Sequence, residues 1–297
     1  MLVVGADSAA RRLRPGFVKP SYDPLVSALE LAELVRRRQP CVVLTGAGVS
    51  TESGIPDFRS RTGLWAHIDP LEYASLEALR SDPRKVWSFY KPRIAVLTEA
   101  EPNLAHRALA ELERLGLVEA IVTQNIDLLH ERAGSRNVVE VHGSIRTATC
   151  PACGERQPLE QVTELLEGAD APACPTCGEI LKPDVVFFGE LLPSDATDRA
   201  TELARRARLL LVVGSALEVY PVAGLPLETI AAGGELAIVN RGPTALDDRA
   251  ALRIDGTAGE VLPRVAAALG GLAEPCSSAG RTAPPGGTDQ VSSSPPN

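Results

Sequence analysis

Short apolar runs alternate with amphipathic helical stretches along most of this 297-residue chain. Near-continuous apolar strands separated by helices are typical of a parallel sheet covered on both faces. The expected strands are Cys41–Thr45, Ala120–Thr123, Val138–Val141, Asp184–Phe188, Leu209–Val213, Leu236–Val239 and Leu252–Ile254. The expected helices are Leu25–Arg37, Asn103–Leu115, Asp195–Arg208, Val222–Ala232 and Gly259–Leu269. We therefore expect an α/β fold built on a doubly wound parallel sheet.

Two segments interrupt this alternation, the helical stretch Leu71–Leu97 and the cysteine-bearing segment 145–182. We expect both to be insertions that together form a smaller domain beside the sheet. The larger domain is then expected to comprise residues 21–68, 103–144 and 183–272, and the smaller one residues 69–102 and 145–182.

Four cysteines in two Cys-x-x-Cys pairs lie within the second insertion. Cys150 and Cys153 form one pair, Cys174 and Cys177 the other, and Pro and Gly residues beside each pair favour tight turns. This spacing is typical of a tetrahedral zinc site. Disulfides or buried free thiols are the alternatives. With all four positions filled by sulfur, such a zinc ion would be structural.

The two ends of the chain lack apolar periodicity. Residues 273–297 are rich in Pro, Ser and Gly, which predicts a disordered tail, and residues 1–20 are expected to be flexible. The first apolar residues precede the arginines, the reverse of a secretory signal. Cys41 and Cys276 are unsuited to pair with each other, so we expect a reducing, cytoplasmic setting.

The net charge of −8 disfavours binding to nucleic-acid phosphates, which requires a cationic surface. No apolar run approaches the roughly 18 residues that a membrane-spanning helix needs. We therefore expect neither nucleic acid nor membrane as a partner.

The first expected strand leads directly into Gly46-Ala47-Gly48-Val49-Ser50. Two glycines after a strand allow the backbone to turn tightly and to approach a pyrophosphate. The usual third glycine is replaced by Thr51, so a simple strand-to-helix turn is the alternative. In the loop that follows, Asp57, Phe58 and Arg59 suggest a cover for a bound cofactor, or else an ordinary surface loop.

Further polar residues follow other expected strands. Gln124, Asn125 and Asp127 crowd the end of one strand, where amides suit recognition of a carboxamide and Asp127 alternatively caps a helix. His142 follows the next strand and is a candidate general base, or else a structural histidine. His67, His106 and His130 have weaker support. Two more strand ends carry the small-residue turn Gly214-Ser215-Ala216, and Asn240, which suits ribose hydroxyls.

The ordered set of these motifs resembles the sirtuins, the NAD-dependent protein lysine deacylases. The resemblance covers roughly residues 24–270. The motifs are GAGVS, GIPDFR, TQNID, the His142-Gly143 step, the two Cys-x-x-Cys pairs, KPDVVFFGE over Lys182–Glu190, GSALEVYP over Gly214–Pro221, and Asn240.

The resemblance implies a Rossmann-like large domain and a small domain that combines helices with a zinc ribbon. NAD and an acyl-lysine peptide enter the cleft between them. The acyl oxygen attacks C1′ of the nicotinamide ribose and expels nicotinamide. His142 then deprotonates a ribose hydroxyl that attacks the acyl carbon. Water releases free lysine and O-acetyl-ADP-ribose, so the enzyme is an acyl transferase.

The resemblance also assigns site residues. Catalysis is assigned to His142 and Asn125. NAD contacts are assigned to Gly46, Ala47, Gly48, Ser50, Asp57, Phe58, Arg59, Trp65, Gln124, Asn125, Ile126, Asp127, Gly214, Ser215, Ala216, Asn240, Arg241, Gly242 and Ala258. A strand-like clamp on the peptide backbone is assigned to Val186, Phe187, Phe188, Gly189, Glu190, Glu218, Val219 and Tyr220.

Three alternatives to plain deacetylation remain at this stage. Tyr90 and Arg93 form a Tyr-x-x-Arg step that resembles the pair with which one sirtuin class grips succinyl or malonyl lysine. An exposed Tyr and Arg on a helix surface is the ordinary explanation for the same step. The second alternative is mono-ADP-ribosyl transfer to protein, and the third is a noncatalytic NAD-binding module.

Overall fold

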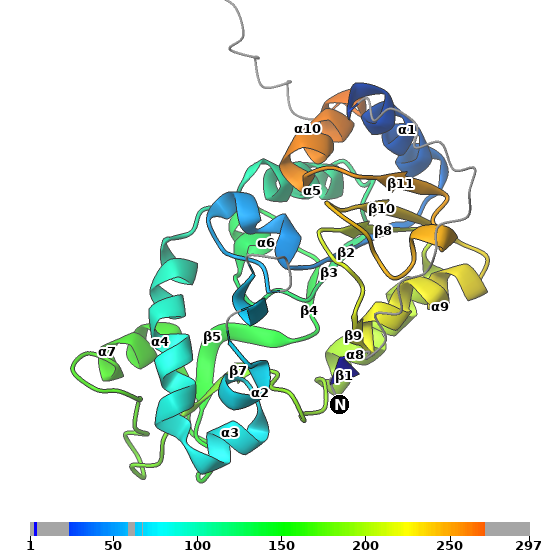
Figure 1. Cartoon of the computed structure of the whole chain (residues 1–297). Helices are drawn as coiled ribbons and strands as arrows, with labels where there is room; N and C mark the ends of the chain where they lie inside the picture. Colours follow the sequence, from blue (N-terminus) through cyan, green and yellow to red (C-terminus); the bar gives the residue numbers. More distant parts are fainter. Residues whose placement is uncertain (1–2, 5–23, 59–62, 67, 271–297) are drawn as a thin grey trace, which may run out of the picture.

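The computed structural model describes residues 3–4, 24–58, 63–66 and 68–270. The expected tail at 273–297 and most of the flexible stretch 1–20 lie outside these residues. Within them, six strands form a parallel sheet in the order β11-β10-β8-β2-β3-β4 (Figure 1). The strands are β2 (Cys41–Thr45), β3 (Ala120–Thr123), β4 (Val138–Glu140), β8 (Leu209–Val213), β10 (Glu235–Val239) and β11 (Leu252–Ile254). The expected doubly wound sheet is confirmed.

The order of the strands creates a switch point between β2 and β8. From β2 the chain adds β3 and β4 on one side, then returns to add β8, β10 and β11 on the other. In such sheets, ligands bind beyond the carboxyl ends of the strands at the position where the order reverses. The turns after β2 and β8 meet at this position.

Helices cover both faces of the sheet because adjacent residues of each buried strand point to opposite faces. Val43 belongs to the core under α1 (Pro24–Arg37), α5 (Leu104–Arg114) and α10 (Ala258–Ala268). Its neighbour Val42 belongs to the opposite core, under α8 (Ser194–Arg206) and α9 (Leu225–Ala231). The helix expected over Val222–Ala232 is divided into η4 (Val222–Gly224) and α9.

The two insertions form a separate body with its own core. Its helices are α2 (Pro70–Tyr73), α3 (Leu76–Ser81), α4 (Pro83–Glu99) and α7 (Leu159–Leu165), and its strands are β5 (Gly143–Thr149), β6 (Arg156–Pro158) and β7 (Lys182–Val185). Trp87 and Phe187 are fully buried in this core. The indole Nε1 of Trp87 donates to Leu181 O at 2.7 Å, which ties α4 to the cysteine-bearing segment.

One expected strand pairs differently from the prediction, and one further strand was not expected. The strand expected over Asp184–Phe188 is β7, which ends at Val185 and pairs antiparallel with β5 rather than joining the parallel sheet. Residues Val3–Val4 lie in the stretch expected to be flexible, yet they form β1, which pairs antiparallel with β9 (Val219–Tyr220). In both cases the pairing partner is distant in sequence, so local composition carries no signal for it.

Candidate active site

Three glycines pack against one another where the sheet changes direction. Gly46 N–H donates to Val213 O at 3.1 Å, and Gly48 N–H donates to Gly214 O at 2.9 Å. A Cβ added to Gly48 would lie 2.8 Å from the Cα of Gly214, and one added to Gly214 would lie 2.3 Å from Val49 N. The two small-residue turns therefore pack against each other, and their expected approach to a pyrophosphate stays a prediction.

A chain of polar side chains begins beside these glycines. Asn125 Nδ2 donates to Ser50 Oγ at 3.0 Å, and Ser50 Oγ donates to Asp127 Oδ2 at 2.7 Å. Ser50 and Asp127 are buried. Asp127 Oδ1 also accepts the Leu129 N–H at 3.0 Å at the start of α6 (Leu129–Arg132), so the capping alternative holds together with the polar cluster. The adjoining Leu128 has a φ of 65°, a strained value for a leucine.

Gln124 connects the three central strands. Its side-chain Nε2 donates to Ser215 Oγ at 3.0 Å beyond β8 and approaches Thr45 O at the end of β2 at 3.3 Å. The amide therefore crosses the switch point. The sequence predicts that the Gln124 amide recognises a carboxamide at this strand end. In the structure the same amide also links the two halves of the sheet.

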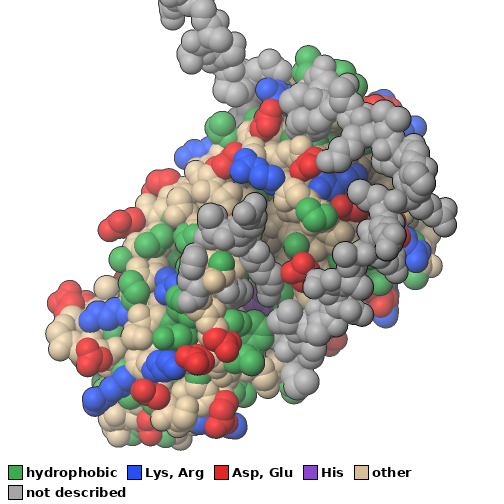
Figure 2. Space-filling model, in the orientation of Figure 1, with side chains coloured by type: hydrophobic (Ala, Val, Ile, Leu, Met, Phe, Trp, Pro, Cys, Tyr) green, Lys and Arg blue, Asp and Glu red, His purple; other side chains and the backbone are tan. Residues whose placement is uncertain are grey.

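His142 lies directly after β4 in an orientation suited to a base. Its Nδ1 lies 3.1 Å from Gln124 O. A carbonyl oxygen only accepts hydrogen bonds, so Nδ1 carries the proton and Nε2 carries the lone pair. Of the described histidines only His142 is partly exposed. Figure 2 shows the surface hollowed between the two bodies, with histidine atoms visible in the hollow.

Two further histidines belong to this cluster although their sequence support is weak. His106 Nε2 lies 3.4 Å from Ser50 Oγ, and His130 Nε2 lies 2.9 Å from Thr45 Oγ1. Their rings contact each other at a centroid distance of 4.9 Å. One sequence signal was available: Asn103 and His106 form a reciprocal capping box, which fixes His106 at the start of α5.

Stability is expected to fall as the pH drops below about 6.5, the pKa of an ordinary histidine. Burial lowers the pKa of His106 to about 4 despite Asp127, and burial with the nearby His106 lowers that of His130 well below its usual value. Between pH 6.5 and 4 the unfolded chain therefore binds protons that the folded chain does not. Each histidine then lowers the free energy of unfolding by up to ~1.4 kcal/mol per pH unit.

Urea unfolding at pH 7 and at pH 5.5 measures this difference. The H130Q variant is the control, because it removes one of the two titrating groups and should show a smaller loss. Equal stability of the unaltered chain at the two pH values would contradict the burial of neutral imidazoles.

The remaining residues expected to contact NAD lie in several loops and helix starts of the described chain. Asp57 and Phe58 are half-buried, whereas Arg59 lies outside the described residues. Trp65 lies in η3 (Leu64–Ala66), and the half-buried Ile126 packs against the core of the small body. Ala258 begins α10, and Asn240, Arg241 and Gly242 follow β10. The assignment of these residues to NAD stays a prediction.

The expected peptide clamp is only partly available. Phe187 is fully buried, and its N–H donates to Glu190 Oε2 at 2.7 Å. Phe188 N–H donates to Ala74 O and Val186 N–H to His142 O, both at 2.8 Å. These N–H groups have acceptors within the chain, and the assignment of the clamp residues to the peptide stays a prediction. On the other side, Val219 and Tyr220 form the strand β9 as expected, and β1 pairs with it.

Tyr90 and Arg93 lie on one helix, because α4 continues through Pro92. The Tyr90 ring is buried and stacks on Phe187 with centroids 5.6 Å apart. The Arg93 guanidinium lies 3.4 Å from the centroid of the Phe89 ring and donates from Nη1 to Phe89 O, and its buried Nε has no hydrogen-bond partner among the described residues. The ordinary explanation, a Tyr and an Arg on a helix surface, is wrong for the buried Tyr90, whereas Arg93 is half-buried. Burial also lowers the pKa of Arg93.

The four cysteines of the second insertion converge as predicted. Their Sγ atoms all lie within 4.8 Å of one another, with separations of 3.4 Å for Cys150–Cys177 and 3.6 Å for Cys153–Cys174. Tetrahedral zinc with Zn–S bonds of about 2.3 Å places its sulfurs about 3.8 Å apart. All four are free thiols, so the disulfide alternative is excluded.

The electrostatics of this cluster also fit a cation. Backbone N–H groups, first that of Cys153, lower the pKa of Cys150 to about 7. The pKa of Cys177 rises to about 12 although the Glu179 N–H lowers it, because the neighbouring sulfurs disfavour further negative charge. The donor set of four sulfurs suits zinc, which binds cysteine as the thiolate.

Comparison with known proteins identifies the family. The Sir2 family profile matches residues 46–221, more than half of the chain. The chain belongs to the Sir2 family. Relatives of this Sir2 chain include the "NAD-dependent protein deacylase" of Pyrococcus furiosus, 44% identical over 80% of this chain and 95% of that protein. The "NAD-dependent protein deacetylase" of Thermotoga maritima is also 44% identical, over 80% of this chain and 96% of that protein.

Solved Sir2 structures share the fold of this chain. A complex of Sir2 with a deacetylated p53 peptide and 3′-O-acetyl ADP-ribose has a TM-score of 0.77 and 44% identity, covering 80% of this chain and 96% of that one. A complex of Sir2 with a p53 peptide and NAD+ has a TM-score of 0.73 and 43% identity, covering 80% and 95%. The Rossmann-like sheet with a smaller helical body and a four-cysteine module is therefore that of the Sir2 family.

Proposed function

We propose that this chain is an NAD-dependent protein lysine deacylase that removes acetyl groups and forms nicotinamide, O-acetyl-ADP-ribose and free lysine. The observation that carries the proposal is the convergence of Asn125, Asp127 and His142 at the strand ends beside the switch point. The relatives named for this activity are 44% identical over nearly their whole length.

Different residues of this chain would bind NAD and act as the general base. Asn125 and Asp127, held together through Ser50, would orient the carboxamide and ribose of NAD. The backbone turns after β2 and β8, which lie at the switch point of the sheet, would bind the pyrophosphate. His142, with its Nε2 lone pair directed by the Gln124 contact, would remove the proton of a ribose hydroxyl.

The cysteine module would act at a distance from this chemistry. A zinc ion bound by Cys150, Cys153, Cys174 and Cys177 would have four sulfur ligands and no open position for water or substrate. Its contribution would be to fold the ribbon that carries β5, and Gly143 at the start of β5 directly follows His142.

Incubation with NAD and an acetylated peptide tests the proposal. Mass spectrometry should show O-acetyl-ADP-ribose forming in step with the loss of acetylated peptide. Mono-ADP-ribosyl transfer would instead add mass to the protein acceptor, and a noncatalytic module would release no nicotinamide. Either result would overturn the proposal.

A second candidate activity is removal of acidic acyl groups such as succinyl. The half-buried Arg93, whose Nε has no hydrogen-bond partner among the described residues, lies on the same helix as the buried Tyr90 and favours it. A carboxylate at this position would complete the hydrogen bonds of the guanidinium and neutralise its charge.

Replacing Arg93 by methionine is expected to lower desuccinylation at least tenfold and to leave deacetylation within about twofold, since a charge-assisted hydrogen bond contributes roughly 1.5–3 kcal/mol. Acetyl and succinyl versions of one peptide, followed by mass spectrometry, give the comparison. The R84M variant is the matched control, because Arg84 lies on the same helix. Equal loss of both activities would show that Arg93 serves the fold rather than acyl selection.

We further propose a reducing, cytoplasmic setting, with acyl-lysine proteins as partners and neither nucleic acid nor membrane. All five cysteines among the described residues are free thiols, and zinc binding requires them reduced. None of the described helices combines the length and apolarity that crossing a membrane requires.

A further inference from the structure

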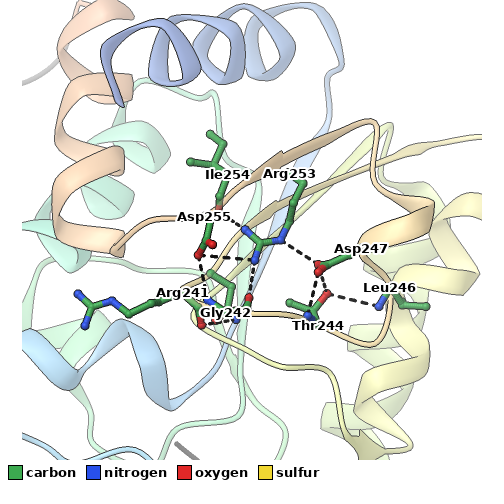
Figure 3. A network of polar contacts seen from close by, with 9 residues as sticks. Arg241, Gly242, Thr244, Leu246, Asp247, Arg253, Ile254 and Asp255 are labelled. Carbon is green, nitrogen blue, oxygen red and sulfur yellow. Dashed lines mark hydrogen bonds and ion pairs between the residues drawn. The ribbon is translucent and has the colours of Figure 1, made fainter. Parts of the chain in front are cut away.

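Arg253 is the centre of a polar network that joins the edge strand β11 to the loop following β10 (Figure 3). Its side chain is only 20% exposed, and its Nε donates to Asp247 Oδ1 at 2.8 Å. Its terminal nitrogens donate to the carbonyl oxygens of Ile254 and Gly242. One guanidinium therefore links its own strand to two separate points of the loop.

The network fixes the peptide groups on both sides of Gly242. The Gly242 N–H donates to Asp255 Oδ1 at 2.9 Å, and Gly242 O accepts from Arg253 and, at 3.2 Å, from Asn240 Nδ2. Gly242 has a φ of 80°, a conformation that few other residues adopt. Rotation of either peptide group would break a hydrogen bond to a charged side chain.

The far part of the loop is anchored as well. Thr244 donates to Asp247 through both its hydroxyl, at 2.7 Å, and its N–H, at 3.1 Å. Ala245 N–H donates to Ala216 O at 3.0 Å, in the turn that follows β8. The loop is thus held between β11 and the turn that packs on the first glycine turn.

We infer that Arg253 is a positioning residue for the adenosine half of NAD, an inference that rests on the proposed function. Asn125 and His142 lie at the ends of β3 and β4, on one side of the switch point. A dinucleotide that crosses this point with its carboxamide at Asn125 extends its other half over the ends of β8 and β10. Asn240, Arg241 and Gly242 lie there. Arg253 holds this loop from β11 through its hydrogen bond to Gly242 O and does not contact the ligand.

The planar fork of arginine is what this role requires. Arg253 donates in three directions at once, to a carboxylate and two carbonyls, and a lysine ammonium on a flexible stem does not reproduce that geometry. Asp247 and Asp255 keep the guanidinium oriented, with Asp255 Oδ1 at 4.0 Å from Nη2.

The R253M variant is the direct test. Its affinity for ADP-ribose, measured by titration calorimetry, should fall about tenfold or more, since hydrogen bonds to a charged group are lost. KM for NAD should rise by a similar factor, while kcat and KM for the acetylated peptide stay within twofold. The R249M variant is the matched control, because Arg249 is an exposed arginine of the same segment.

The D255A variant tests whether the anchoring of Gly242 matters for NAD binding, without altering Arg253. Asp255 is 58% exposed, so its loss should leave folding intact while freeing the Gly242 N–H. The same rise in KM for NAD, at unchanged kcat, is expected.

Unchanged ADP-ribose affinity in R253M would overturn the inference. So would a parallel loss of kcat, peptide KM and melting temperature, which marks a purely structural role. If the unaltered chain binds ADP-ribose but releases no nicotinamide, the proposed function fails, and the calorimetric comparison of R253M with R249M still decides the role of Arg253.

Discussion

The H142A variant is expected to lose deacylation by about 10²–10⁴-fold, the range by which a positioned general base accelerates a reaction. The Nδ1 contact to Gln124 O leaves the lone pair on Nε2 of His142, and His142 is the one partly exposed histidine among the described residues. Initial rates of peptide deacetylation at saturating NAD and peptide give the comparison with the unaltered chain.

Two measurements separate loss of the base from loss of the fold. Affinity for ADP-ribose should be unchanged in H142A, because Ser50, Asn125 and Asp127 hold one another without His142. The H142Q variant keeps a donor that can reach Gln124 O but has no base, so it should be as inactive as H142A. Substantial activity in H142Q would show that orientation, and not proton removal, is the contribution of His142.

Removal of zinc is expected to unfold the small body, because a structural thiolate site contributes on the order of 10 kcal/mol to folding. That body has its own core, in which Cys150 and Cys174 are buried together with Trp87 and Phe187. The C174A variant should bind far less than one zinc per chain and melt at a much lower temperature. Metal analysis and a thermal melt measure the two effects.

The fifth described cysteine provides the control for this experiment. Cys41 is fully buried in β2, where burial raises the pKa of its thiol to about 12, so it is neither a ligand nor a reactive group. The C41A variant should keep one zinc per chain. Full zinc content in C174A would contradict the assignment of the four-cysteine site.

Features set by local patterns could be predicted from the sequence. The buried strands of the parallel sheet read as apolar runs, and β2, β3, β8 and β11 have the predicted bounds. The cysteine pairs and the strand-end residues Asn125 and His142 are also local signals, because chemistry at a sheet edge is placed by where each strand ends.

Features set by long-range packing could not. The segment Asp184–Phe188 is apolar and reads as a strand of the main sheet, but its pairing with β5 depends on where the ribbon folds back. His106 and His130 read as ordinary helix residues, and only the packing of α5 and α6 against the end of β2 brings them to Ser50 and Thr45. The role of Arg253 likewise could not be predicted, because no sequence motif marks it and its partner Gly242 lies in a separate loop.

The three glycines at the switch point, Gly46, Gly48 and Gly214, cannot be substituted independently of one another, because each packs against the facing turn. A side chain at Gly48 or Gly214 would meet main-chain atoms of the opposite turn, and one at Gly46 would meet Gly214 O as well as Ser215 Cβ. Shrinking a neighbouring side chain would therefore not remove the main-chain contacts. Redesign of cofactor preference in this chain therefore has to start from the outer loops, such as the one that Arg253 braces, and leave this turn as it is.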